Sequence, residues 1–381
     1  MVNAKLQPVH DSSDAKPEAG IALCLSGGGY RAMMFHAGCL WRLNELGLLG
    51  KLNRVSSVSG GSITAGVLGV NWAALNVQAG IPSPQFEEAL VAPLRRMAST
   101  TVDEAAILGG IFLPGSVSDH VADKYAEVLF GAKTLQDLPD APRFVINATN
   151  VQSGVLMRFS KPYMRDYRVG QVLNPKLPLA RVVAASSAFP PVLSPCEIRV
   201  ADYGLQFEPP SPGDEDLPFP PYTTDLILTD GGAYDNLGLE TAWKRYDTIL
   251  VSDGGKHVEP EPSPHHDWAR HAFRVLDLID SQVRALRVRL LIGLFEAGER
   301  KGCYWGIHQK IGVYTAPDML PCPSDATGKL AETATRLQAM DDGLQERLIN
   351  WGYAICDASL RSYFDPKLQR PLGFPYPSSA V

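Results

Sequence analysis

The sequence predicts an α/β fold of three layers, in which helices cover both faces of a mostly parallel central sheet. Short, continuously apolar segments, which are typical of strands buried on both faces, alternate along the chain with segments of helical periodicity. Glycine-rich turns directly follow two of these apolar segments. Because ligands bind where loops leave the carboxyl ends of parallel strands, we expect a functional site at that edge of the sheet.

The expected strands are short apolar runs bounded by glycine, proline or polar residues. They lie at residues 21–25, 54–58, 144–149, 225–229 and 248–252, and residues 154–160 are the expected hairpin partner of the third run. The expected helices have apolar or small residues three to four positions apart. They lie at residues 30–49, 59–70, 179–188, 267–300 and 330–363, with a further short helix from Asn236.

The chain is expected to form one α/β domain over residues 21–381, after a disordered lead-in over residues 1–20. Residues 72–140 carry helical patterns separated by prolines, which we interpret as a helical insertion that caps the core. Residues 203–224 are rich in proline and acidic residues and predict an exposed loop. Residues 267–365 form the expected C-terminal helical part.

Composition excludes several classes of protein. The formal net charge is −6 and the pI is about 5.8, which argues against a nucleic-acid-binding protein. None of the six cysteines forms a CxxC pair, so we expect reduced, structural thiols rather than a zinc or redox site. The first 20 residues lack the apolar centre of a signal peptide, and no stretch reaches the ~18 apolar residues of a spanning helix. We therefore expect a cytoplasmic protein that can sit at the periphery of a membrane.

A candidate nucleophile lies in the segment Ser57-Val-Ser59-Gly-Gly61, between an expected strand and an expected helix. This is the setting of a nucleophile elbow, a tight strand-to-helix turn that exposes a serine oxygen and requires small neighbours. The usual pattern is G-x-S-x-G, and Ser57 occupies the first glycine position. A serine that caps an ordinary helix would give the same local pattern.

A candidate anion site lies in the segment Ser26-Gly-Gly-Gly-Tyr-Arg31, directly after the first expected strand. Consecutive glycines expose backbone N–H groups that can stabilise an oxyanion, and Arg31 adds positive charge. The same segment fits the dinucleotide-binding pattern G-x-G-x-x-G/A. That alternative requires an acidic residue about 20 residues further on, where this chain has residues 54–58 and the serine turn.

Two aspartates are candidates for a general base. Asp230 and Asp253 each end an expected strand, and two glycines follow each of them. A carboxylate followed by glycines can approach the end of a neighbouring strand closely. The pattern alone does not choose between the two aspartates, and Asp-Gly-Gly also occurs in ordinary turns.

Taken together, these segments resemble the patatin-like phospholipase family, which has a glycine-rich oxyanion loop, a G-x-S-x-G serine and a later D-G-G aspartate in this order. Residues 185–191 (Ala-Ser-Ser-Ala-Phe-Pro-Pro) resemble the family's A-S-x-A-x-P segment. The resemblance covers roughly residues 20–255. The chain departs from the family pattern at Ser57 and at Ala32, where the family often has glycine.

The resemblance implies a patatin-like fold with a Ser–Asp dyad, in which Ser59 is the nucleophile and Asp230, rather than Asp253, is its base. The implied oxyanion hole consists of Gly27, Gly28, Gly29 and Arg31. The implied activity is that of a lipid acyl hydrolase, of the phospholipase A or lysophospholipase type, with no cofactor and no metal. The implied partners are a phospholipid or other lipid ester and a membrane surface that the protein contacts transiently, with no nucleic acid. The resemblance implies no particular oligomeric state.

The residues alone also fit other catalytic arrangements and other functions. A Ser–Asp–His triad would use one of the downstream histidines, which are His257, His265, His266, His271 and His308. A non-lipid esterase or thioesterase, or a catalytically silent binding protein, would fit the same scaffold. The arginines among apolar residues 283–291 fit a membrane-surface helix, but we favour a core-facing helix with a charged outer face.

Overall fold

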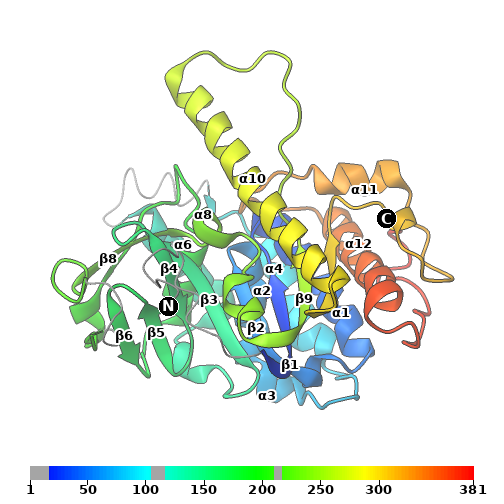
Figure 1. The fold of residues 1–381 in the computed structure, drawn as a ribbon, viewed down its shortest axis with the longest axis horizontal. Coiled ribbons are helices and arrows are strands. Elements are labelled where there is room, and N and C mark those ends of the chain that lie inside the picture. Colours follow the sequence, from blue (N-terminus) through cyan, green and yellow to red (C-terminus); the bar gives the residue numbers. More distant parts are fainter. Residues whose placement is uncertain (1–16, 104–115, 210–216) are drawn as a thin grey trace, which may run out of the picture.

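The computed structural model describes residues 17–103, 116–209 and 217–381, so most of the expected lead-in lies outside the described residues. One sheet forms the centre of the molecule (Figure 1). Its parallel strands are, in order across the sheet, β10 (Lys301–Gly306), β9 (Tyr246–Asp253), β1 (Glu18–Leu25), β2 (Leu52–Val58) and β3 (Arg143–Asn150). The antiparallel strands β4 (Val155–Phe159), β5 (Tyr163–Asp166) and β6 (Gly170–Leu173) continue it.

Two further antiparallel strands, β7 (Cys196–Arg199) and β8 (Asp225–Asp230), complete the sheet beside β3. Strand β3 pairs first with β2, up to the pair Val58–Asn147, and then with β8, from the pair Ala148–Asp230. Because β4 occupies the other edge of β3 over the same residues, β2 and β8 share one edge and meet end to end. This register brings the carboxyl ends of β2 and β8 together.

Alternating residues of β1 contribute to two cores on opposite faces of the sheet. Leu23 and Leu25 belong to the larger core with α1 (Gly29–Glu45) and α2 (Gly60–Val70). Ala22 and Cys24 belong to a smaller core, which includes Leu291 of the helix α10 (Trp268–Glu296). The predicted α/β fold with helices on both faces is therefore confirmed.

The other α-helices among the described residues are α3 (Trp72–Leu75), α4 (Ala92–Ala98), α6 (Val117–Tyr125), α7 (Leu179–Ser186), α8 (Gly232–Asp235), α9 (Glu240–Trp243), α11 (Ser324–Ala331) and α12 (Asp342–Ser359). Helix α12 packs along α1, and glycines allow the close approach. A Cβ atom on Gly38 would lie 1.9 Å from Ile349 O, and one on Gly352 would lie 2.0 Å from Phe35 O. The C-terminal part therefore covers the first helix of the α/β unit directly.

Two sequence-based expectations need correction, and one strand runs in a direction that the sequence did not predict. Strand β8 is antiparallel to β3. The C-terminal part also supplies β10, whose buried Cys303 and Trp305 alternate with more exposed residues, so it lacks the continuous apolar run of a central strand. In α10, Arg284 is buried while Leu286 and Leu290 are exposed, so a core-facing helix with a charged outer face is wrong.

Candidate active site

Ser59 occupies a strained turn between β2 and α2. Its backbone angles are φ 51° and ψ −122°, a combination that non-glycine residues rarely adopt and that commonly marks a functional site. A Cβ atom on Gly60 would lie 2.1 Å from Gly29 O, and one on Gly61 would lie 2.4 Å from Leu25 O. The two glycines after Ser59 are therefore required by the neighbouring backbone, as expected for a nucleophile elbow.

Buried hydroxyl groups form hydrogen bonds with this turn. Ser59 N donates to Ser186 Oγ (3.0 Å), and Ser186 Oγ donates to Asn147 O (2.6 Å). Ser62 Oγ donates to Ser57 Oγ (3.0 Å), so the serine that replaces the usual glycine has a partner and is fully buried. The segment at residues 185–191 thus contacts the elbow through Ser186, a role that its sequence pattern did not reveal.

Asp230 ends β8 beside the elbow, and the same segment holds its backbone. Asp230 N donates to Ala188 O (3.0 Å), and Gly231 N donates to Ser186 O (3.2 Å). Ser186 therefore binds the Ser59 amide through its hydroxyl and the turn after Asp230 through its carbonyl. One residue fixes both candidate catalytic groups relative to each other.

The Asp230 carboxyl is almost completely buried and is poised to bind a proton. Its Oδ1 accepts from Gly232 N (2.7 Å), while its Oδ2 has no hydrogen-bond partner of standard geometry among the described residues. Burial raises the pKa of Asp230 to about 7, although the Gly232 amide and the nearby Ser59 hydroxyl lower it. A carboxylate of this pKa is a much stronger base than an exposed aspartate, as general-base catalysis near neutral pH requires.

The glycine loop lies beside Ser59, and its members differ in what they can donate. A Cβ atom on Gly27 would lie 3.1 Å from Ser59 Cβ, but Gly27 N already donates to Asn236 O (3.0 Å). Gly28 and Gly29 have φ angles of 141° and 60°, which favour glycine. Within the described residues, neither of their N–H groups donates to another protein group. The available donors therefore come from Gly28 and Gly29.

The Arg31 guanidinium hydrogen-bonds to backbone carbonyl groups of two distant segments. Its Nε and Nη2 donate to Gly254 O (3.2 and 3.0 Å), and its Nη1 donates to Thr333 O (2.6 Å). The side chain is 1% exposed. Arg31 therefore joins the turn after β9 to the segment before α12, and its contribution of charge to the oxyanion hole stays a prediction.

A cavity of about 280 Å³ opens at Ser59. Its wall is largely apolar, and the residues that line it are Gly29, Ser59, Asp103, Ser187, Phe189, Pro190, Pro191, Val192, Leu193, Thr335, Arg336 and Leu337. The part at residues 335–337 lies far from the motifs in sequence. It is held by backbone hydrogen bonds from Tyr30 N to Arg336 O (3.0 Å) and from Val102 N to Leu337 O (2.8 Å).

Asp253, the alternative base, is part of a buried ion pair. It accepts from Arg284 Nη1 (3.2 Å), Tyr304 OH (2.7 Å) and Gly255 N (2.9 Å). Although burial opposes its charged form, Arg284 and these donors hold the pKa of Asp253 below its usual value. A carboxylate committed to three donors is a poor proton acceptor for Ser59.

The downstream histidines lie in two groups. His257 and His308 stack on each other with ring centroids 4.4 Å apart, and burial, followed by the charge of His257, lowers the pKa of His308 to about 4. His265, His266 and His271 are exposed near the start of α10. In the part of the chain that the structure describes, no cluster of His, Cys, Asp or Glu could hold a metal ion.

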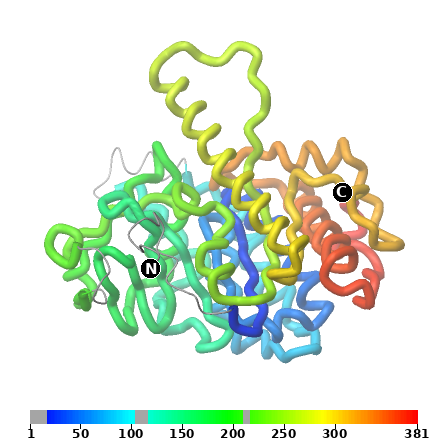
Figure 2. The backbone as a smooth tube through the Cα atoms, viewed as in Figure 1, coloured from blue at the N-terminus to red at the C-terminus, as the bar shows by residue number. Residues whose placement is uncertain are grey.

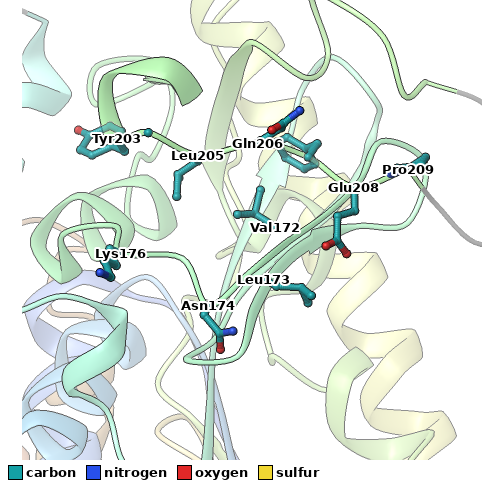
Figure 3. A pocket seen from close by; sticks show the side chains of 11 residues that line it. Val172, Leu173, Asn174, Lys176, Tyr203, Leu205, Gln206, Glu208 and Pro209 are labelled. Carbon is teal, nitrogen blue, oxygen red and sulfur yellow. The ribbon is translucent and has the colours of Figure 1, made fainter.

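A second, larger pocket of about 710 Å³ lies between residues 172–176 and 203–209 (Figure 3). Its wall combines Leu173 and Phe207 with Lys176 and Glu208, and it shares no residue with the Ser59 cavity. The described residues of its wall include no serine, cysteine or histidine. The Ser59 cavity is therefore the candidate active site despite its smaller volume.

A family model described as "Patatin-like phospholipase" matches residues 23–243, more than half of the chain. The chain belongs to the patatin-like phospholipase family. The matched residues of this patatin-like protein include the glycine loop, the Ser59 elbow and Asp230. The cavity wall at residues 335–337 and the strand β10 lie beyond them.

Solved structures are similar to this patatin-like protein at low sequence identity. Human GIVD cytosolic phospholipase A2 has a TM-score of 0.50 and 14% identity, over 88% of this chain and 58% of that one. VipD from Legionella pneumophila has a TM-score of 0.34 and 15% identity, over 89% of this chain and 66% of that one. The chain thus spans less than two thirds of either protein. No curated protein sequence matches it.

Proposed function

We propose that this patatin-like protein is a serine acyl hydrolase that cleaves carboxyl esters of phospholipids or related lipids, as a phospholipase A or lysophospholipase. The observation that carries the proposal is the end-to-end meeting of β2 and β8. It places Asp230, with its pKa raised to about 7 by burial, beside the strained nucleophile-type turn at Ser59. Family membership supports a lipid substrate.

The first half-reaction transfers the acyl group to the enzyme. Asp230 accepts the proton of the Ser59 hydroxyl as Oγ attacks the ester carbonyl. The resulting oxyanion accepts hydrogen bonds from the N–H groups of Gly28 and Gly29, which have no other partner among the described residues. Collapse of the tetrahedral intermediate breaks the ester C–O bond, and protonated Asp230 gives its proton to the leaving alcohol.

The second half-reaction releases the fatty acid. Asp230 accepts a proton from water, which attacks the acyl carbonyl on Ser59, and returns that proton to Ser59 Oγ as the acyl–serine bond breaks. The residues need neither a metal nor a cofactor for these steps. The apolar wall formed by Phe189, Val192, Leu193 and Leu337 suits the acyl chain of the substrate.

The test is fatty-acid release from dispersed phosphatidylcholine and lysophosphatidylcholine, with a soluble acyl ester and an acyl thioester as comparison substrates. We expect the purified protein to hydrolyse the lipids in the presence of a chelator. Ser59→Ala and Asp230→Asn are expected to lose at least about a thousandfold in kcat. Hydrolysis of the soluble ester or thioester alone would instead identify a non-lipid esterase or thioesterase.

A further inference from the structure

Helix α10 projects from the body of the molecule together with the preceding loop at residues 254–267 (Figures 1 and 2). Of its 29 residues only Arg284 and Leu291 are buried. Its large exposed apolar residues are Trp268, Phe273, Val275, Leu276, Leu278, Ile279, Val283, Leu286 and Leu290. Isolated exposed apolar residues are normal on a protein surface, but this number on one helix is not.

Most of these side chains form one continuous face. Leu276, Ile279, Val283, Leu286 and Leu290 are three or four positions apart, so they line one side of the helix. We call these five residues the α10 stripe. These five side chains are between 39% and 58% exposed, so the stripe faces solvent. No helix among the described residues is long and apolar enough to cross a membrane.

The charges around the stripe are largely neutralised by local pairs. Arg270 pairs with Asp267 (2.7 Å), Arg274 with Glu261 (3.5 Å) and Lys256 with Asp277 (3.5 Å). Arg287, nearer the body, pairs with Glu240 (3.2 Å). An apolar face between paired charges complements a surface that carries both signs of charge, such as zwitterionic lipid headgroups, rather than a polyanion.

Helix α10 stands beside the candidate catalytic site. It follows the turn at the carboxyl end of β9, and Arg287 Nη2 donates to Tyr234 O (3.3 Å) in α8, which begins two residues after Asp230. After burial, the charge of Asp280 is a further cause that raises the pKa of Asp230. From Asp280, the helix extends outward by about 18 Å to Trp268, at 1.5 Å per residue.

We propose that the α10 stripe, with Phe189 and Val192 at the cavity, forms a surface that docks on the zwitterionic phospholipid layer holding the substrate. Phe189 is 51% and Val192 42% exposed, and both line the Ser59 cavity. Trp268, 86% exposed at the tip of α10, is the residue type that favours the membrane–water interface. This inference rests on the proposed function, because it specifies that the enzyme takes its lipid substrate from a phospholipid layer.

A second copy of the chain is the competing occupant, because a stripe with spacing of three and four also suits helix–helix packing. Such a partner accounts for the stripe but not for the exposed Phe189 and Val192 at the cavity. A lipid layer accounts for both, since the substrate reaches Ser59 from it. The observations therefore favour the lipid layer.

The experiment compares two triple variants of the full chain. The stripe variant is Leu276→Gln, Ile279→Gln and Leu286→Gln, and the matched control is His271→Gln, Arg289→Gln and Glu296→Gln on exposed polar positions of the same helix. Co-sedimentation with phosphatidylcholine vesicles and hydrolysis of those vesicles are measured beside hydrolysis of a soluble short-chain ester. Gel filtration with light scattering reports the oligomeric state.

We expect the stripe variant to lose at least about tenfold in vesicle binding and vesicle hydrolysis, with soluble-ester hydrolysis within about twofold of wild type. The control variant should match wild type in all three. Unchanged vesicle binding by the stripe variant would overturn the proposal. If the stripe variant bound vesicles as wild type does but lost a dimer that wild type forms, the stripe would be assigned to a second copy of the chain. Stripe-dependent vesicle binding by a protein that hydrolyses no ester would support the surface and refute the proposed function.

Discussion

At the level of single residues, Ser186 connects the two halves of the proposed dyad. Replacing Ser186 by alanine leaves the amide of strained Ser59 without its acceptor, and a lost buried hydrogen bond costs about 1–3 kcal/mol. We predict that Ser186→Ala lowers kcat about tenfold or more with KM nearly unchanged, and that Ser186→Thr restores most of it. Ester kinetics of both variants check this.

The matched control for Ser186 is Ser160, which is also fully buried but whose hydroxyl has no partner among the described residues. Ser160→Ala should leave kcat within about twofold. Equal losses in Ser160→Ala and Ser186→Ala would show that Ser186 acts through general stability rather than through the position of Ser59.

Asp230 gives a prediction about pH. Because its folded pKa is raised to about 7, and the base must be deprotonated, kcat/KM should fall about tenfold per unit below pH 7.

A raised carboxyl pKa also means that the folded state binds protons more tightly than the unfolded state between the ordinary value of 3.8 and about 7. Folding stability from this group is therefore present at low pH and lost as pH rises through 7.

The Asp230→Asn variant should avoid this loss of folding stability at high pH, because its neutral side chain brings no charge into the protein interior. It should be more stable than wild type at pH 8, by a few kcal/mol, and this advantage should shrink by pH 5. Urea unfolding of both proteins at the two pH values measures it. A pH-independent difference would contradict the raised pKa.

The residue types of the candidate site were predictable from the sequence, but their hydrogen-bond partners were not. The serine turn and Asp230 follow from local patterns next to apolar runs. That Gly27 N is occupied by Asn236 O, and Arg31 by Gly254 O and Thr333 O, depends on segments more than 200 residues away in the chain. Tertiary contacts of this kind leave no periodic signal.

At the scale of secondary-structure elements, the continuous apolar runs predicted the central strands because both of their faces are buried. Strands β5, β6 and β7 are short and only partly buried, so their patterns resemble those of loops. The antiparallel direction of β8 was not visible either, because direction depends on how the chain returns to the sheet. The exposure of α10 was missed because amphipathicity identifies an apolar face but not what covers it.

The contact between α1 and α12 gives a prediction about stability. Gly38→Ala places a Cβ atom against the backbone of α12, and we expect a loss of about 2 kcal/mol or more in unfolding free energy. Gly328→Ala is the matched control, since nothing lies within 4 Å of a Cβ atom at this position of α11. That control should stabilise the protein by up to about 1 kcal/mol, as measured by urea unfolding.

At the scale of the whole molecule, the C-terminal part is joined to the first helix by buried charges. Asp357 of α12 pairs with Arg42 of α1 (2.8 Å) and with Arg361 (2.7 Å), and all three side chains are buried. Asp357→Asn removes the counter-charge of buried Arg361 and leaves buried Arg42 only its pair with Glu45 (3.0 Å), so we predict a loss of about 3–5 kcal/mol. The exposed pair Asp318–Arg370 is the control, and Asp318→Asn should change stability by less than about 1 kcal/mol.

The C-terminal part also completes the wall of the candidate active site. Residues 335–337 line the Ser59 cavity and hydrogen-bond to α1 and to Val102, although the family match ends at residue 243. The motifs therefore supply the residues of the proposed dyad, while a later segment shapes the cavity beside Ser59.

The most direct test of the central claim is the intact mass of the protein after reaction with a fluorophosphonate, which requires an activated serine but no particular lipid. We predict one adduct on wild type, no adduct on Ser59→Ala, and an adduct that forms at least about a hundredfold more slowly on Asp230→Asn. An unmodified, folded wild-type protein, or an Asp230→Asn variant that reacts as fast as wild type, would contradict the Ser59–Asp230 dyad.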